Sequence, residues 1–221
     1  MSVHGREFLL LSKYQGLLFY LGGFDMKLLK WLTVGLFTIG VCLVGYSLFN
    51  IGKSAYDVEQ RKVEAKRLIN DQEKNKEIKN SPEDFTFNKG ETIGLLHVPK
   101  LGKELPIVEG TDEDELAVGV GHYSGTALPL QKDQIVLSGH RDTVFRNFDQ
   151  LKIGDTFVVE MPYGKFEYEI YETDIVDADD RTVIRSTAPD EILTVTTCYP
   201  FDYVGDAPYR YIFYAKMSST N

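Results

Sequence analysis

Residues 156–176 read "TFVVEMPYGKFEYEIYETDIV", and this stretch indicates how the chain folds. Apolar and polar residues alternate on both sides of Pro162-Tyr163-Gly164, and Phe166, Tyr168 and Ile170 occupy every second position after the turn. Successive side chains of a strand point to opposite faces of the sheet. The pattern therefore predicts a hairpin of two strands, each with one buried face.

Further segments of the same kind lie on either side of this hairpin. Short apolar runs separated by Gly, Pro and Asp predict strands within residues 92–109, 134–140, 191–198 and 210–217. Two short helical segments are expected at 112–120, which has an acidic first turn, and within 143–151. Many short strands with little helix predict an all-β domain, built as a closed barrel or a sandwich.

Charge is distributed unevenly along the 221 residues, whose formal net charge is −9. Residues 1–80 contain 12 Lys/Arg and 8 Asp/Glu, whereas the rest of the chain contains 12 and 25. A nucleic-acid surface needs a basic face. The acidic C-terminal part therefore excludes nucleic acid as an expected partner.

Residues 31–52, "WLTVGLFTIGVCLVGYSLFNIG", carry no charge. Twenty-two residues of helix suffice to cross a hydrocarbon core of about 30 Å. A buried core helix and a cleaved signal peptide are the alternatives, but the run is longer than a usual signal core and no Ala-x-Ala-like site follows it. We expect an uncleaved membrane anchor. Lys and Arg are about balanced on its two sides, so charge leaves its orientation open.

The segments next to the anchor differ in character. Residues 1–25 contain an apolar stretch interrupted by Lys13, and a short basic head follows at Met26. They are either an extension upstream of a translation start at Met26 or a weak second membrane-associated segment. Residues 53–84 are rich in charge and helix formers and predict a solvated helical stalk, which Ser81-Pro82 ends. The β domain then occupies 85–221.

One thiol stands at the end of a predicted strand, in "LTVTTCYPF" at 193–201. The second cysteine, Cys42, lies in the anchor, and no C-x-x-C or H-x-x-x-H spacing indicates a metal site. Cys198 is thus either a small buried apolar residue or a nucleophile.

A thiolate nucleophile needs a base or a cation nearby. His140 ends an apolar strand and is the best placed histidine, whereas His97 and His122 are expected to be structural. If the last two strands pair as antiparallel neighbours, Arg210 comes within reach of Cys198. Its guanidinium could then stabilise a thiolate or an oxyanion, or it could form a surface salt bridge.

These residues resemble the sortases, the membrane-anchored cysteine transpeptidases of Gram-positive bacteria, and within them class D. "TVTTC" at 194–198 is similar to the Thr-Leu-x-Thr-Cys signature, with Val195 in place of Leu. The segments "SGHRDTVFRNFDQLKIGD", "GHYSGTALP", "LPIVEGTDEDEL" and "CYPFDYVGDAPYRYIFYA" are similar to further sortase segments. The resemblance covers about residues 90–217 and the anchor.

The resemblance implies a closed eight-stranded β-barrel with Cys198 as nucleophile, His140 as general acid/base, and Arg210 holding the substrate backbone and the oxyanion. It implies cleavage of a Leu-Pro-x-Thr-Gly-like sorting signal in secreted proteins through a thioacyl enzyme. The acceptor would be an amine of a cell-wall precursor or a pilin lysine.

It also implies that residues 1–30 are cytoplasmic and that the catalytic barrel is extracellular. We expect no cofactor and assign no residue to a metal. Two alternatives remain open: a tethered barrel that binds peptides without turnover, and a hydrolytic cysteine peptidase. Thioester trapping separates the first from a transpeptidase, and diversion of the product by an added amine separates the second.

Overall fold

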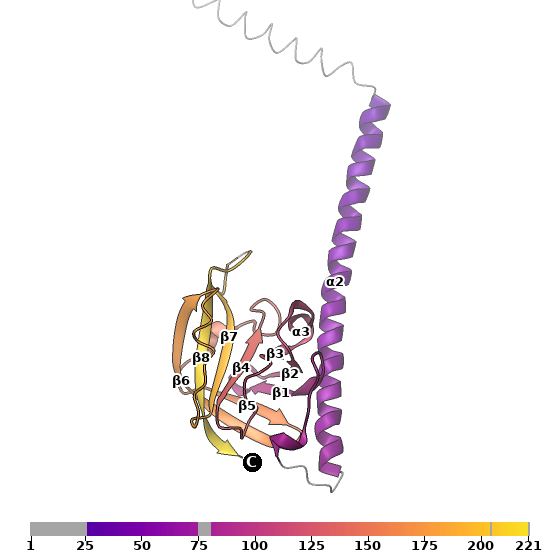
Figure 1. Cartoon of the computed structure of the whole chain (residues 1–221). Helices are drawn as coiled ribbons and strands as arrows, with labels where there is room; N and C mark the ends of the chain where they lie inside the picture. The colour runs from indigo at the N-terminus through magenta and orange to yellow at the C-terminus, as the bar shows by residue number, and fades with distance from the viewer. Residues whose placement is uncertain (1–25, 75–80, 204, 221) are drawn as a thin grey trace, which may run out of the picture. The chain divides into compact units, whose positions relative to one another are not determined.

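The computed structural model describes residues 26–74, 81–203 and 205–220 (Figure 1). Residues 1–25, with the expected upstream extension, lie outside the described part. The helical elements in chain order are α2 (Met26–Lys74), η1 (Pro82–Asp84), η2 (Pro99–Leu101), α3 (Glu113–Val118) and η3 (Phe148–Gln150). The strands are β1 (Thr92–Val98), β2 (Lys103–Glu109), β3 (Val120–His122), β4 (Gln134–Gly139), β5 (Thr156–Met161), β6 (Gly164–Asp177), β7 (Ile192–Tyr199) and β8 (Tyr209–Thr220).

The strands form a closed barrel in the order β1-β2-β3-β4-β7-β8-β6-β5. Strand β2 pairs with β3 in parallel, and so does β4 with β7, whereas the other neighbours are antiparallel. The predicted all-β class and the closed eight-stranded barrel are both confirmed, and the sandwich is not formed. The expected short helices within 112–120 and 143–151 are present as α3 and η3.

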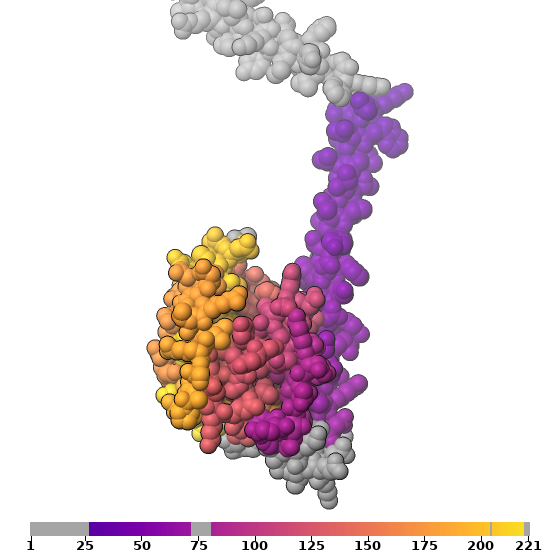
Figure 2. All heavy atoms as spheres, in the orientation of Figure 1, coloured from indigo at the N-terminus to yellow at the C-terminus, as the bar shows by residue number. Residues whose placement is uncertain are grey.

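The β5–β6 hairpin explains how the barrel fills its interior. Its last pair joins Met161 to Gly164, and the alternating Phe166, Tyr168 and Ile170 are all buried. They share one cluster with Phe157 of β5 and Phe213 of β8, whose rings form an edge-to-face contact at 5.9 Å between centroids. Aromatic side chains of this size provide most of a core's buried area. In the space-filling view, the orange and yellow strands β6–β8 cover one side of the barrel (Figure 2).

The chain divides into two compact units, Met1–Gly52 and Lys53–Asn221, and helix α2 has a part in each. In its first part the apolar side chains of the expected anchor, such as Trp31 and Phe37, are exposed. Among the described residues, α2 is the one helix that is both long enough and apolar enough to cross a membrane, judged by length and composition alone. Its most apolar window has a mean hydropathy of 2.0. This is the part of the chain for which the sequence predicts a membrane anchor.

The second part of α2 groups with the barrel. Ala65 and Ile69 are buried in one cluster with Leu95 of β1. The Lys66 ammonium lies 2.6 Å from the Glu104 carboxylate, and the Thr92 hydroxyl donates to Glu64 over 2.7 Å. The segment that the sequence indicated as solvated therefore covers a patch of β1. The boundary between stalk and barrel at residues 84 and 85 stays a prediction.

Candidate active site

Strand β4 delivers His140 to the rim of the barrel. Gly139 is its last residue, and a Cβ placed there would lie 2.6 Å from the Phe145 ring, so glycine is required by close packing. The carbonyl oxygen of His140 accepts hydrogen bonds from the amides of Thr143 (3.3 Å) and Phe145 (3.1 Å). A tight turn thus follows His140, and its half-buried side chain stands where the strand ends.

Strands β7 and β8 bring Cys198 and Arg210 together. The two strands are antiparallel neighbours, as predicted, and these two residues are direct partners in their register. Cys198 is half-buried and is not in a disulfide. One residue earlier, the buried Thr197 hydroxyl donates to the carbonyl of Gly139 over 3.0 Å, which joins the end of β7 to the end of β4.

His140, Cys198 and Arg210 line one cleft with a volume of about 280 Å³. Its walls carry apolar side chains from β6, β8 and the segment before β7, together with the hydroxyls of Thr194 and Thr196. Side chains of both kinds suit an extended peptide, whose backbone needs hydrogen-bond partners and whose side chains need apolar contact. Asp180 and Arg181 also line the cleft.

The guanidinium of Arg210 is held by backbone. Its Nη1 atom donates to the carbonyl oxygens of Ala207 (3.1 Å) and Tyr209 (3.0 Å). Within residues 26–74, 81–203 and 205–220, no carboxylate forms an ion pair with Arg210, so the salt-bridge alternative is not formed. Among the residues that the structure describes, its hydrogen bonds use Nη1 alone, so Nε and Nη2 could donate to a ligand.

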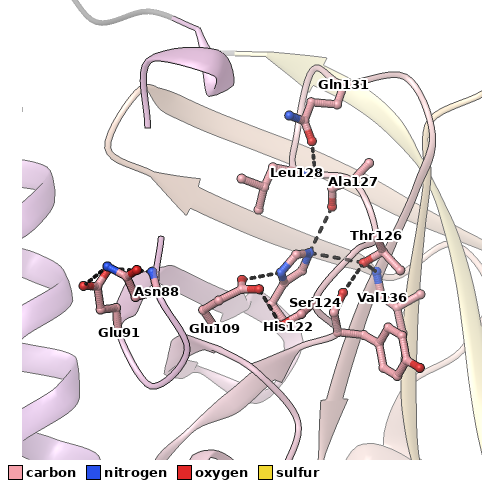
Figure 3. Close-up of polar contacts among 11 residues, drawn as sticks. Asn88, Glu91, Glu109, His122, Ser124, Thr126, Ala127, Leu128, Gln131 and Val136 are labelled. Carbon is pink, nitrogen blue, oxygen red and sulfur yellow. Dashed lines mark hydrogen bonds and ion pairs between the residues drawn. The ribbon is translucent and has the colours of Figure 1, made fainter. Parts of the chain in front are cut away.

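The other two histidines of the barrel have structural contacts. His97 pairs with Glu160 across β1 and β5. His122 is 3% exposed, with Nδ1 2.6 Å from Glu109 and Nε2 3.1 Å from the Ala127 carbonyl oxygen (Figure 3). Burial alone raises the pKa of Glu109, but the hydrogen bond and charge of His122 outweigh it and leave that pKa below its usual value. Both histidines hold strands together, as the sequence indicated.

Sequence reasoning missed Arg141. Arg141 is buried, with 7% of the residue exposed, and its guanidinium donates to the carbonyl oxygens of Pro200 (3.1 Å, from Nη1) and Gly205 (2.9 Å, from Nη2). These acceptors lie in the loop between β7 and β8, which separates Cys198 from Arg210. The signal available in the sequence was the Arg directly after His140, in "SGHRD".

The arrangement suits nucleophilic chemistry on an acyl group. It combines a thiol, an imidazole and a fixed cation at one cleft, the set that acyl transfer through a thioester needs. Among the residues that the structure describes, no group of three His, Cys, Asp or Glu side chains is placed to hold a metal ion.

Known proteins share this architecture. A family model described as "Sortase domain" matches residues 96–218. The chain is 45% identical over 183 residues to sortase D of Bacillus subtilis (strain 168), covering 80% of this chain and 92% of that protein. Among solved structures, a sortase D5 transpeptidase of Clostridium perfringens is similar with a TM-score of 0.58 and 27% identity, over 70% of this chain and 98% of that one.

The catalytic domain of B. anthracis SrtD is similar with a TM-score of 0.53 and 46% identity, over 62% of this chain and 93% of that one. The residues matched by the family model include all those that line the cleft. With this fold and this match, the chain belongs to the sortase family of transpeptidases.

Proposed function

We propose that this sortase cleaves a Leu-Pro-x-Thr-Gly-like sorting signal in secreted proteins through a thioacyl intermediate on Cys198. The observation that supports the proposal is the convergence of Cys198, His140 and Arg210 on one cleft at the barrel rim. His140 directly follows β4, Cys198 is the last but one residue of β7, and Arg210 is the second residue of β8, so rigid β structure supports all three.

The first half-reaction forms the thioester. The Cys198 thiolate attacks the Thr carbonyl carbon, and the carbonyl oxygen becomes an oxyanion that accepts hydrogen bonds from Arg210. The oxyanion then collapses, and the carbon–nitrogen bond to the Gly breaks. The leaving nitrogen takes a proton from the His140 imidazolium, because an unprotonated amide nitrogen leaves poorly.

The second half-reaction consumes the thioester. An acceptor amine, from a cell-wall precursor or a pilin lysine, attacks the same carbonyl carbon and gives a proton to the neutral His140. The Cys198 thiolate leaves, which restores the thiolate and the imidazolium and forms a new amide. Water in place of the amine would give a free acid, which is the outcome for a hydrolytic peptidase.

The test uses the full chain in detergent and a library of Leu-Pro-x-Thr-x peptides. Mass spectrometry is expected to find an acyl adduct on Cys198 and, with an added amine, an amide product. Cys198→Ala should lack both. Absence of any adduct on the wild-type chain would refute the proposed mechanism, and a free acid unaffected by amine would make the protein a hydrolase.

We also propose that residues 31–52 anchor the protein, with residues 1–30 in the cytoplasm and the stalk and barrel outside. The chain has two cysteines, Cys42 in the anchor and Cys198 in the cleft. A membrane-impermeant maleimide added to intact cells should label Cys198 and leave Cys42 unlabelled. Labelling of Cys198 only after lysis would contradict this orientation.

A further inference from the structure

The paired backbone of β4 and β7 ends one residue before the two candidate reactive residues. Its last pair joins Gly139 to Thr197, and His140 and Cys198 are the next residues on the two strands. The Thr197 hydroxyl closes this end of the ladder by its hydrogen bond to Gly139. Beyond that pair the β4–β7 ladder holds neither His140 nor Cys198, so their separation depends on other contacts.

Arg141 makes the next connection. It follows His140 directly, and its Nη1 donates to the carbonyl oxygen of Pro200, two residues past Cys198. Its Nη2 donates to the carbonyl oxygen of Gly205, in the loop that leads to Arg210. The reactive pair is thus bracketed by Thr197–Gly139 on one side and by Arg141–Pro200 on the other.

The burial of Arg141 makes this connection stiff. Its side chain is 6% exposed, and its nearest carboxylate, Asp142 at 3.4 Å, is 73% exposed. Loop carbonyls and the Tyr203 ring, 5.9 Å from the guanidinium carbon to the ring centroid, surround the charge. A buried cation that loses its acceptors is left with unsatisfied donors, which is unfavourable. The segment after β4 and the loop after β7 are therefore expected to move together.

We propose that Arg141 is a positioning residue, which fixes the imidazole of His140 relative to the thiol of Cys198 by holding the carbonyl oxygens of Pro200 and Gly205. The inference rests on the proposed roles of His140 and Cys198. Arg141 itself does not touch the reacting atoms in this proposal. It acts through the backbone on both sides of them.

The two acceptors also explain why this residue is an arginine. They are reached from two different guanidinium nitrogens, in the fork geometry that only arginine has. A lysine keeps the charge but presents one nitrogen on a flexible stem. Arg141→Lys therefore removes the fork and retains the cation.

The experiment measures alkylation of Cys198 by iodoacetamide against pH, in the full chain carrying Cys42→Ala. His140→Ala defines the profile of an unassisted thiol, and the wild-type chain should react faster below pH 8 because an imidazolium stabilises the thiolate. Arg141→Lys should move the profile most of the way to that of His140→Ala. The other charged groups of the cleft, Asp180, Arg181 and Arg210, are the same in all three chains.

Turnover gives a second readout on the best peptide of the library. A displacement of about 1 Å at a reacting group can cost about 10²-fold in rate, so Arg141→Lys should lower kcat by that order and change KM less than threefold. Arg146→Lys is the matched control, because Arg146 is exposed and donates to the carbonyl of Asp142 within its own turn. It should leave both readouts unchanged.

A substitution on the acceptor side tests the same connection and leaves Arg141 unchanged. Gly205 has φ +99 and open space where a Cβ would go, so Gly205→Ala strains the backbone that presents this carbonyl. Gly154→Ala, with φ +91 and the same open space, carries the matching strain in a different turn. Gly205→Ala should shift the alkylation profile in the same direction as Arg141→Lys, and Gly154→Ala should not.

The outcomes distinguish a failure of the proposed catalytic mechanism from a failure of the role of Arg141 alone. If the wild-type profile equals that of His140→Ala, the thiol and the imidazole are not coupled and the proposed mechanism fails, and the inference fails with it. If the wild type differs from His140→Ala but Arg141→Lys and Gly205→Ala both match the wild type, the inference alone is overturned. A loss of kcat fully explained by a lower folded fraction in circular dichroism would also overturn it.

Discussion

Gly139→Ala tests whether packing behind His140 sets the position of that residue. A Cβ at this site would lie 2.6 Å from the Phe145 ring, whereas carbon atoms in contact lie about 3.5–4.0 Å apart, so ring or strand must move by about 1 Å. Phe145 is fully buried and stacks on Phe148 with 4.1 Å between centroids, so the ring has no space to retreat. Overpacking of this kind typically costs about 1–3 kcal/mol.

For a domain of this size, that cost lowers Tm by roughly 2–12 °C. If the end of β4 moves instead of the ring, His140 moves with it, and a shift of about 1 Å lowers kcat by about 10²-fold. Thermal melting and peptide turnover by the full chain measure the two effects. Both should be present in Gly139→Ala.

A double-mutant cycle sharpens this prediction. Phe145→Leu alone removes part of the core and destabilises the protein. Combined with Gly139→Ala it also removes the clash, so the double variant should be more stable than the sum of the single effects, with a coupling of about 0.5–3 kcal/mol. Additive effects, or an Ala variant with wild-type Tm and kcat, would refute the reasoning.

Three further predictions follow from contacts described above. Arg210→Ala should lower kcat by about 10²–10³-fold and Arg210→Lys by less, with smaller changes in KM. Steady-state kinetics measure both constants. A large change in KM with kcat near wild type would mean that backbone amides, and not Arg210, stabilise the oxyanion. The pKa of Glu109 is lowered in the folded state, so its stabilisation is complete above its ordinary value of 4.5 and is lost as pH falls through the folded value. Glu109→Gln should therefore destabilise the protein at pH 7 and have a smaller effect at pH 3 in urea titrations, whereas an equal effect at both pH values would exclude the charge of this residue as the cause. In a chain that starts at residue 82, Ile69 no longer covers Leu95. The free energy of unfolding should therefore be lower by up to about 1.5–3 kcal/mol than in a chain that starts at residue 53. Equal melting temperatures of the two chains would show that the helix adds no stability.

The sequence predicted the strands of the β domain and the approach of Cys198 to Arg210 because both depend on regular periodicity. Periodicity left a barrel or a sandwich open, and the closed barrel followed from the resemblance to sortases. In the β5–β6 hairpin the apolar positions are two residues apart and are the buried ones. The pairing of Cys198 with Arg210 needed only one assumption, that the last two strands are antiparallel neighbours. The convergence of His140 on the same cleft followed from the resemblance to sortases.

Other features have no periodic signal. The acceptors of Arg141 lie 59 and 64 residues away in the sequence, in an irregular loop whose carbonyl directions no local pattern encodes. In the second part of α2, Ala65 and Ile69 are sparse apolar residues in a charged run, so the sequence indicated solvent on every side. Their burial depends on Leu95, a residue of β1 that the sequence placed only on a strand.

The position of β8 in the barrel also has a consequence for the order of folding. Although β8 follows the other strands in the chain, it lies between β7 and β6 and pairs with both. Until β8 is available, the sheet has two open edges and the cleft lacks Arg210. The pairing of β8 with β6 skips β7 and is therefore non-local, and pairings of that kind form slowly. Under the proposed orientation, the barrel would therefore remain unfolded while it is threaded across the membrane, and the nucleophile would meet its cation only after the last strand had been exported.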